Sequence, residues 1–129
     1  EIAKTQIANF SMNEKLLTKM SDICSKGLAI LNNVESGLDE VGALLDEQWM
    51  IKRQLSDSVS NEAIDEIYSR GISAGATGGK LLGAGGGGFM LFYAPQERHE
   101  NIKASLGEKM FVPFRFESTG SSIVYYSHD

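Results

Sequence analysis

A run of glycines is the feature of this sequence that could do chemistry. Between Gly75 and Tyr93 the chain reads GATGGKLLGAGGGGFMLFY, so the glycines stand directly before an apolar run. Glycine loses more backbone entropy on folding than any other residue, so a segment this rich in it needs a local reason. A loop without Cβ atoms lets several backbone N–H groups converge on an anion, but glycine runs also form tight turns. These residues leave both interpretations open.

Two common nucleotide-binding motifs do not fit the glycines. A Walker-type loop ends in Gly-Lys-Ser/Thr, whereas Gly79-Lys80 is followed by Leu81, and Ala74 occupies the position of the first glycine. The glycines from 83 to 88 match the spacing of the dinucleotide fingerprint. That fingerprint must open a helix, and the run that follows here is typical of a strand. The motif therefore belongs to neither class.

Three basic side chains near the glycines are candidate phosphate contacts. Lys52 and Arg53 stand at the end of a predicted helix, and Lys80 lies beside the glycine loop. Guanidinium and ammonium groups are what phosphate recognition requires. Cations at a helix C-terminus also complement the helix dipole, so a capping role for Lys52 and Arg53 stays open. For Lys80 a structural or surface role stays equally open.

Other polar residues predict no catalytic or metal site. His99 and His128 are isolated and are interpreted as surface residues. Asp57, Asp65 and Glu66 are carboxylates that could in principle hold Mg²⁺, but carboxylates scattered over helix surfaces usually serve as solvated charge. We therefore predict neither a catalytic residue nor a metal ligand within this chain.

Composition limits the partners of the protein. The chain has 129 residues, 42% of them hydrophobic, and a net charge of -5, as expected for one globular domain. Such an acidic chain lacks the basic face that nucleic acids or anionic membranes require, which favours small molecules and proteins as partners. Cys24 is the single cysteine, which fits a reducing compartment, and neither an export signal nor a membrane span is apparent. The cytoplasm is the expected location.

The first half of the chain shows helical periodicity. Apolar residues three and four positions apart predict one helix around Leu16 to Leu31. They predict a second helix from Leu38 to about Leu55, packed antiparallel on the first. Asn61 is expected to cap a third helix that ends at the glycines.

The second half shows the shorter period of strands. Lys80–Leu82 is expected to form a short strand, and Phe89–Tyr93 a strand buried on both faces. Pro95 is placed to begin a helix, and two further β-prone segments follow at 112–116 and 123–126. We expect two or three antiparallel strands here. The pattern predicts a single α+β domain over 1–129, helical over 1–75, with the glycine loop, sheet and remaining helix over 76–129.

The glycine segment resembles a known family signature. The residues GATGGKLLGAGGGG, from Gly75 to Gly88, are similar to the third motif of the GHMP kinases, named for galactokinase, homoserine kinase, mevalonate kinase and phosphomevalonate kinase. The flanking segments 49–56, 60–68 and 116–126 resemble the branch of the family that phosphorylates D-glycero-D-manno-heptose 7-phosphate at its anomeric hydroxyl. Fucokinases share parts of the pattern.

The resemblance implies a fold, cofactors and partners. It implies a ferredoxin-like antiparallel sheet packed on helices, an activity that uses ATP and Mg²⁺, and an N-terminal half with the ATP loop and catalytic residues, which we do not find in this sequence. This chain alone is then expected to be inactive, and an apolar face left uncovered would favour a homodimer. The loop expected near the phosphates and the substrate comprises Gly83, Ala84, Gly85, Gly86, Gly87 and Gly88.

The resemblance leaves the substrate and the class of function open. Lys52, Arg53 and Lys80 become candidate contacts to the sugar phosphate. Another member of the family, such as a fucokinase or galactokinase, is an alternative. A free-standing ferredoxin-like module that binds an anion without turnover is a second alternative.

Overall fold

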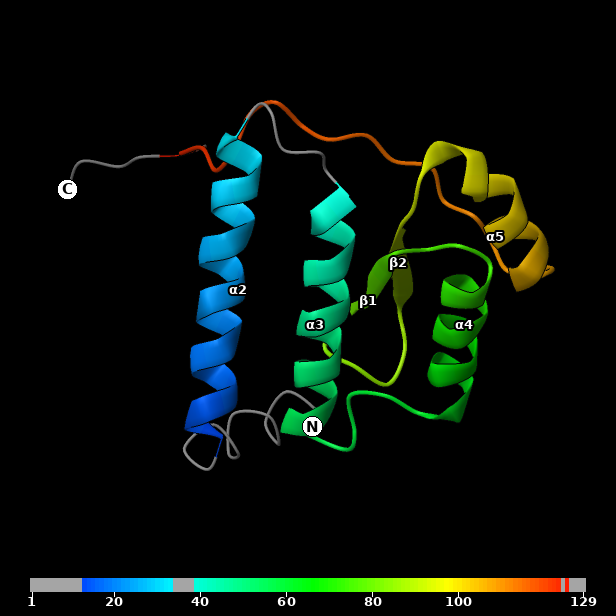
Figure 1. Ribbon diagram of the computed structural model, residues 1–129, viewed down its shortest axis with the longest axis horizontal. Coiled ribbons are helices and arrows are strands. Elements are labelled where there is room, and N and C mark those ends of the chain that lie inside the picture. Colours follow the sequence, from blue (N-terminus) through cyan, green and yellow to red (C-terminus); the bar gives the residue numbers. More distant parts are fainter. Residues whose placement is uncertain (1–12, 34–38, 124, 126–129) are drawn as a thin grey trace.

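The computed structural model describes residues 13–33, 39–123 and 125, which form helices and a small sheet. In chain order the elements are α2 (Glu14–Asn32), α3 (Asp39–Leu55), α4 (Glu62–Ser73), β1 (Gly78–Leu82), β2 (Phe89–Tyr93), the short 3-10 helix η2 (Gln96–Arg98) and α5 (His99–Leu106). Figure 1 shows α2 and α3 side by side and antiparallel, with the strands between α3 and α4. No helix within these ranges is long and apolar enough to cross a membrane.

The helices follow the predicted periodicity. α2, α3 and α4 occupy the segments in which apolar residues recur at helical spacing, and α3 is antiparallel to α2 as expected. Asn61 caps α4 as predicted, because its side-chain oxygen accepts a hydrogen bond from the backbone N–H of Ile64 at 3.0 Å. Pro95 stands directly before η2, which leads into α5. The pattern therefore predicted the helical part of the fold.

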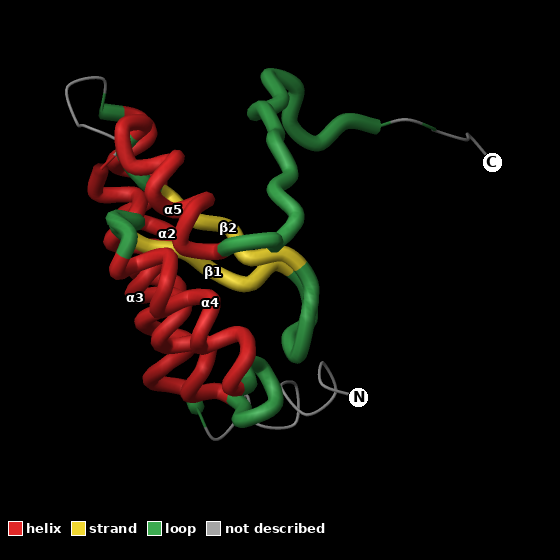
Figure 2. The backbone as a smooth tube through the Cα atoms, turned by 90° about the vertical axis from the view of Figure 1, so that its right-hand side faces the viewer, coloured by secondary structure: helices red, strands yellow, loops and turns green. Residues whose placement is uncertain are grey.

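The sheet consists of one antiparallel pair. β1 and β2 pair from Gly78 opposite Tyr93 to Leu82 opposite Phe89, and the glycine loop 83–88 connects them. Figure 2 shows this pair as a two-stranded ribbon beside the helices. β1 begins two residues before the predicted strand and takes in Gly78 and Gly79.

Glycines let α3 come very close to β1. A Cβ atom on Gly78 would collide with the backbone carbonyl of Gly42 in α3, and a Cβ on Gly42 would collide with Thr77. The helix and the strand are therefore in contact through their backbones. A similar contact brings α4 onto β2, where a Cβ on Gly71 would collide with the ring of Phe92.

The core lies between α3, α4 and the sheet. Trp49 and Val59 are fully buried, and they cluster with Ile64, Tyr68 and Leu81. The ring of Tyr68 lies 6.2 Å from that of Trp49 and 6.1 Å from that of Phe92, measured between centroids. Trp49 is therefore a core residue. This core supports β1 at the point where the glycine loop begins.

Two predictions about the strands were wrong. The segment 112–116 forms no strand, and its side chains are exposed, including Phe116 at 94%. Alternating apolar residues make a strand only where a neighbouring edge accepts its hydrogen bonds, and Pro113 cannot donate one. β2 is half-buried rather than buried on both faces, and Phe89 is 55% exposed.

The remaining prediction for the sheet stays open. Of the segment 123–126, residues 124 and 126 lie outside the described residues, while Ile123 and Tyr125 belong to no strand. The α+β class is confirmed. A ferredoxin-like sheet needs more strands than the two that the described ranges form, so that arrangement stays a prediction.

Candidate functional site

The glycine loop is a connection between β1 and β2 that only glycine can form at some positions. Gly86 has a φ of 73° and Gly88 a φ of 127°, both in the region that L side chains rarely adopt. A Cβ on Gly88 would also lie 2.5 Å from the carbonyl oxygen of Leu82. In contrast, a Cβ on Gly87 would meet nothing within 4 Å. Glycine is thus required at Gly86 and Gly88, whereas a side chain at Gly87 would enter open space.

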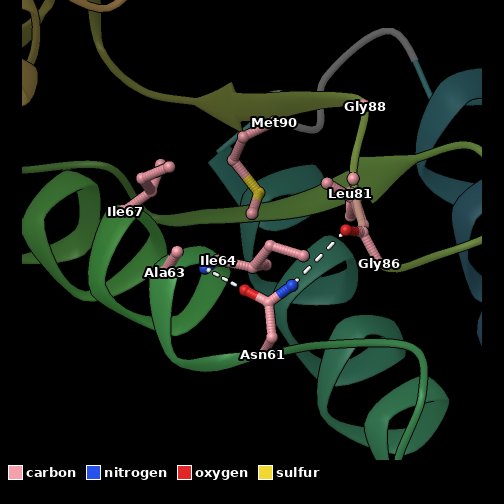
Figure 3. A pocket seen from close by; sticks show the side chains of 9 residues that line it. Asn61, Ala63, Ile64, Ile67, Leu81, Gly86, Gly88 and Met90 are labelled. Atoms are coloured by element: carbon pink, nitrogen blue, oxygen red, sulfur yellow. Dashed lines mark hydrogen bonds between the residues drawn. The ribbon is translucent and has the colours of Figure 1, made fainter.

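Gly86 is attached to the segment that joins α3 to α4. Its N–H donates to the carbonyl of Val59 at 3.1 Å, and its carbonyl accepts from Nδ2 of Asn61 at 3.4 Å. Figure 3 shows the Asn61 side chain reaching from the start of α4 to the loop. The linker between α3 and α4 therefore binds both backbone polar groups of one glycine.

Two of the three candidate cations lie beside the loop. Nζ of Lys52 donates to the carbonyl of Gly83 at 3.2 Å, and Nζ of Lys80 donates to Oε1 of Gln48 at 2.9 Å. Partial burial lowers the pKa of Lys52, and the positive charge of Lys80 lowers it further. Among the described residues neither lysine forms an ion pair. Lys52 thus contacts the first residue of the loop, and Lys80 lies near enough for its charge to act on Lys52.

Arg53 is directed elsewhere. Its Nη2 lies 3.1 Å from Oδ2 of Asp65 on α4, and Oδ1 of the same carboxylate accepts from the hydroxyl of Ser60 at 2.6 Å. Both members of the ion pair are about one-third exposed. Arg53 therefore connects the end of α3 to the first turn of α4.

A small pocket lies between the loop, α4 and the sheet. It has a volume of about 250 Å³. The residues that line it are Asn61, Ala63, Ile64, Ile67, Leu81, Gly86, Gly87, Gly88 and Met90. Apart from Asn61 and the backbone of the three glycines, this lining is apolar. The pocket therefore offers few side-chain hydrogen bonds, and polar contacts to a ligand would come from the loop backbone.

His99 does not line this pocket. His99 is exposed, and its Nε2 lies 3.1 Å from the carbonyl oxygen of Ala94. His128 lies outside the described residues. Within the ranges that the structure describes, no three His, Cys, Asp or Glu side chains are grouped so that they could hold a metal ion.

The contacts of Asn61 and Val59 with the loop were not predicted. Asn61 is 25 residues from Gly86 in the sequence, and no spacing rule connects two residues this far apart. The capping signal identified Asn61 but explained only one side of its amide. The contact between Lys52 and Gly83, which are 31 residues apart, could not be predicted for the same reason.

The chain belongs to the GHMP kinase family. Residues 29–112, more than half of the chain, match the family described as GHMP kinases C terminal. The matched segment contains α3, α4, both strands and α5, and therefore the whole of the glycine loop and its contacts.

Two curated relatives share this segment. The chain is 39% identical over 79 residues to a D-glycero-alpha-D-manno-heptose 7-phosphate kinase of Campylobacter jejuni, an alignment that covers 60% of this chain. It is 34% identical over 95 residues, or 71% of the chain, to a bifunctional fucokinase/GDP-fucose pyrophosphorylase of Arabidopsis thaliana. The aligned part is 23% of the first relative and 8% of the second. This chain thus corresponds to a small part of each.

Proposed function

We propose that this chain is the C-terminal domain of a longer ATP-dependent sugar kinase. The substrate we propose is D-glycero-D-manno-heptose 7-phosphate, phosphorylated at its anomeric hydroxyl. The observation that carries the proposal is the glycine loop, which lies inside the family match and is attached to α3 and α4 by side chains. The name of the Campylobacter relative supports the choice of sugar.

In this proposal the loop positions the reactants and does not perform the chemistry. Phosphoryl transfer depends mainly on positioning and on stabilising negative charge. The open space at Gly87 would let a phosphate approach the backbone closely. We place the ATP loop, the Mg²⁺ ligands and the catalytic residues in an N-terminal half of the same protein. When bound, ATP and Mg²⁺ would supply the phosphoryl group and charge neutralisation.

Among the three candidate cations, we propose that Lys52 and Lys80 contact the sugar phosphate. Lys52 contacts Gly83 of the loop, Lys80 lies in β1 just before it, and neither has a carboxylate partner within the described part of the chain. Arg53 has Asp65 as its partner, so its charge is already balanced. We therefore assign Arg53 a structural role between α3 and α4.

A fucokinase is the second candidate. The Arabidopsis relative aligns with a larger share of this chain than the Campylobacter relative does, although at lower identity. Fucose carries no phosphate, so this alternative leaves Lys52 and Lys80 without the proposed partner. The two candidates therefore differ in what these lysines do.

Phosphoryl transfer by the full-length protein tests the proposal. The protein is incubated with ATP and Mg²⁺ and with heptose 7-phosphate, fucose or galactose in turn, and phosphorus NMR identifies the product. An anomeric phosphate on the heptose alone is the expected result. Transfer only to fucose or galactose would retain the family and overturn the substrate. No transfer to any of the three sugars would contradict the proposed activity.

A further inference from the structure

The side-chain amide of Asn61 performs two different tasks. Its oxygen accepts a hydrogen bond from the N–H of Ile64 and so caps α4. Its nitrogen donates to the carbonyl of Gly86 in the glycine loop. Figure 3 shows the two bonds leaving opposite sides of the same amide. One side chain therefore connects the first turn of a helix to the middle of the loop.

The position of Gly86 depends on the linker between α3 and α4. Besides Asn61, the carbonyl of the fully buried Val59 accepts from the N–H of Gly86. Val59 belongs to the core, which makes its carbonyl a rigid anchor. Asn61 supplies the second attachment, because its Nδ2 donates to the carbonyl of the same glycine. Two attachments restrict the rotation that a glycine with a positive φ would otherwise have.

We propose that Asn61 is a positioning residue for phosphoryl transfer, acting through the carbonyl of Gly86. The proposal rests on the proposed kinase function and extends it to a residue outside the loop. A Cβ on the neighbouring Gly87 would meet nothing within 4 Å, so a phosphate can approach the loop there. A shift of Gly86 moves Gly87 with it. Small displacements of positioning groups can lower rates about 100-fold.

The two tasks require different chemistry, and this makes them separable. Aspartate and serine cap helices about as well as asparagine does, because a cap needs only an acceptor. Donation to a carbonyl needs an N–H or O–H group that reaches it. An aspartate has no donor and would place negative charge beside the Gly86 carbonyl, while the serine hydroxyl is too short to reach. Both variants keep the cap and lose the attachment.

Three substitutions in the full-length kinase test the proposal. Asn61→Asp and Asn61→Ser should keep the melting temperature of the wild type but lower kcat/KM about 10-fold. Asn61→Ala, which loses both bonds, should lower kcat/KM as much and the melting temperature as well. Asn101→Asp is the matched control, because Asn101 is exposed on α5 and gains the same charge far from the loop. It should leave both quantities unchanged.

Two readouts separate this proposal from its alternatives. Amide hydrogen exchange should be faster over 83–88 in Asn61→Asp and unchanged over α4, a result that does not depend on knowing the sugar. If Asn61→Asp and Asn61→Ser retain wild-type kcat/KM and loop exchange while Asn61→Ala loses activity, Asn61 is only a helix cap and the proposal is overturned. If the wild type transfers phosphate to none of the sugars, the proposed function fails, and exchange over 83–88 alone decides whether Asn61 holds the loop.

Discussion

Gly78 and Gly87 lie in the same glycine-rich segment, yet a methyl group added to each would meet opposite surroundings. At Gly78 it would collide with the backbone of α3, and at Gly87 it would meet nothing within 4 Å. The first glycine lies in β1, where a helix and a strand touch through their backbones. The second lies in the exposed loop between the strands.

Packing requires glycine at one of these positions and not at the other. Gly78 and Gly79 are glycines because neighbouring chain segments occupy the space of a side chain. Gly87 has no such neighbour among the described residues, and its φ is not in the left-handed region, so folding alone does not require glycine there. The open space at Gly87 leaves room for a phosphate to approach the loop, as the proposed function requires.

Substitution of Gly78 by Ala should have the largest effect on stability. Its Cβ would push α3 away from β1, and overpacking a tight contact costs about 3 kcal/mol of unfolding free energy. Denaturant unfolding measures this loss. Gly120→Ala is the control, because a Cβ there meets nothing within 4 Å. Equal stability of the two variants would show that α3 and β1 are not in backbone contact.

Lys52 and Arg53 are adjacent cations with different contacts, since Lys52 contacts the loop and Arg53 pairs with Asp65. Lys52→Met keeps an unbranched apolar side chain and removes the ammonium group, and it should raise KM for the sugar phosphate about 10-fold in the full-length kinase. Arg53→Met should leave that KM unchanged and lower the unfolding free energy by about 0.5 kcal/mol, because it breaks a partly exposed ion pair with Asp65. Steady-state kinetics and denaturant unfolding measure both variants. The reverse pattern would assign the phosphate to Arg53.

Local patterns in the sequence predicted much of the fold but not its tertiary contacts. Periodicity identified α2, α3 and α4, and the capping preference identified Asn61. The same kind of local pattern failed at 112–116, because alternation indicates a strand without showing which edge it pairs with. β1 was predicted too short because glycines are rare in strands. Here α3 occupies the side-chain space at Gly78, and β2 occupies it at Gly79.

The sequence predicted several residues of the candidate site but not how they contact one another. Glycine spacing identified the loop, and charge identified Lys52, Arg53 and Lys80 as candidates. What distinguishes Arg53 from the lysines is its pairing with Asp65, a contact between two helices. Pairings of this kind depend on how α3 and α4 pack together, which no single-sequence pattern specifies.

Substitution of Tyr68, a core residue, tests how much its buried hydroxyl contributes to the stability of the fold. Its hydroxyl donates to Asp46, and burial together with this carboxylate raises the pKa of the phenol. The unfolded chain ionises this phenol near pH 10, while the folded protein keeps it neutral, so stability falls as the pH rises above about 10. Tyr68→Phe should lose about 1 kcal/mol at neutral pH and show a shallower fall at alkaline pH. Unfolding curves from pH 7 to about 11 measure both, and an unchanged slope would contradict the raised pKa.

Gly87→Ala should have the smallest effect on folding and the most informative one on activity. The Cβ enters open space without strain, so the unfolding free energy should change by less than about 0.5 kcal/mol. If a phosphate approaches the loop at this residue, the same methyl group obstructs it, and kcat/KM of the full-length kinase falls while stability does not. Thermal unfolding and steady-state kinetics on one preparation separate the two quantities. A variant as active as the wild type would mean that no ligand comes close to Gly87, and the open space there would then need an explanation in the contact with the rest of the longer protein.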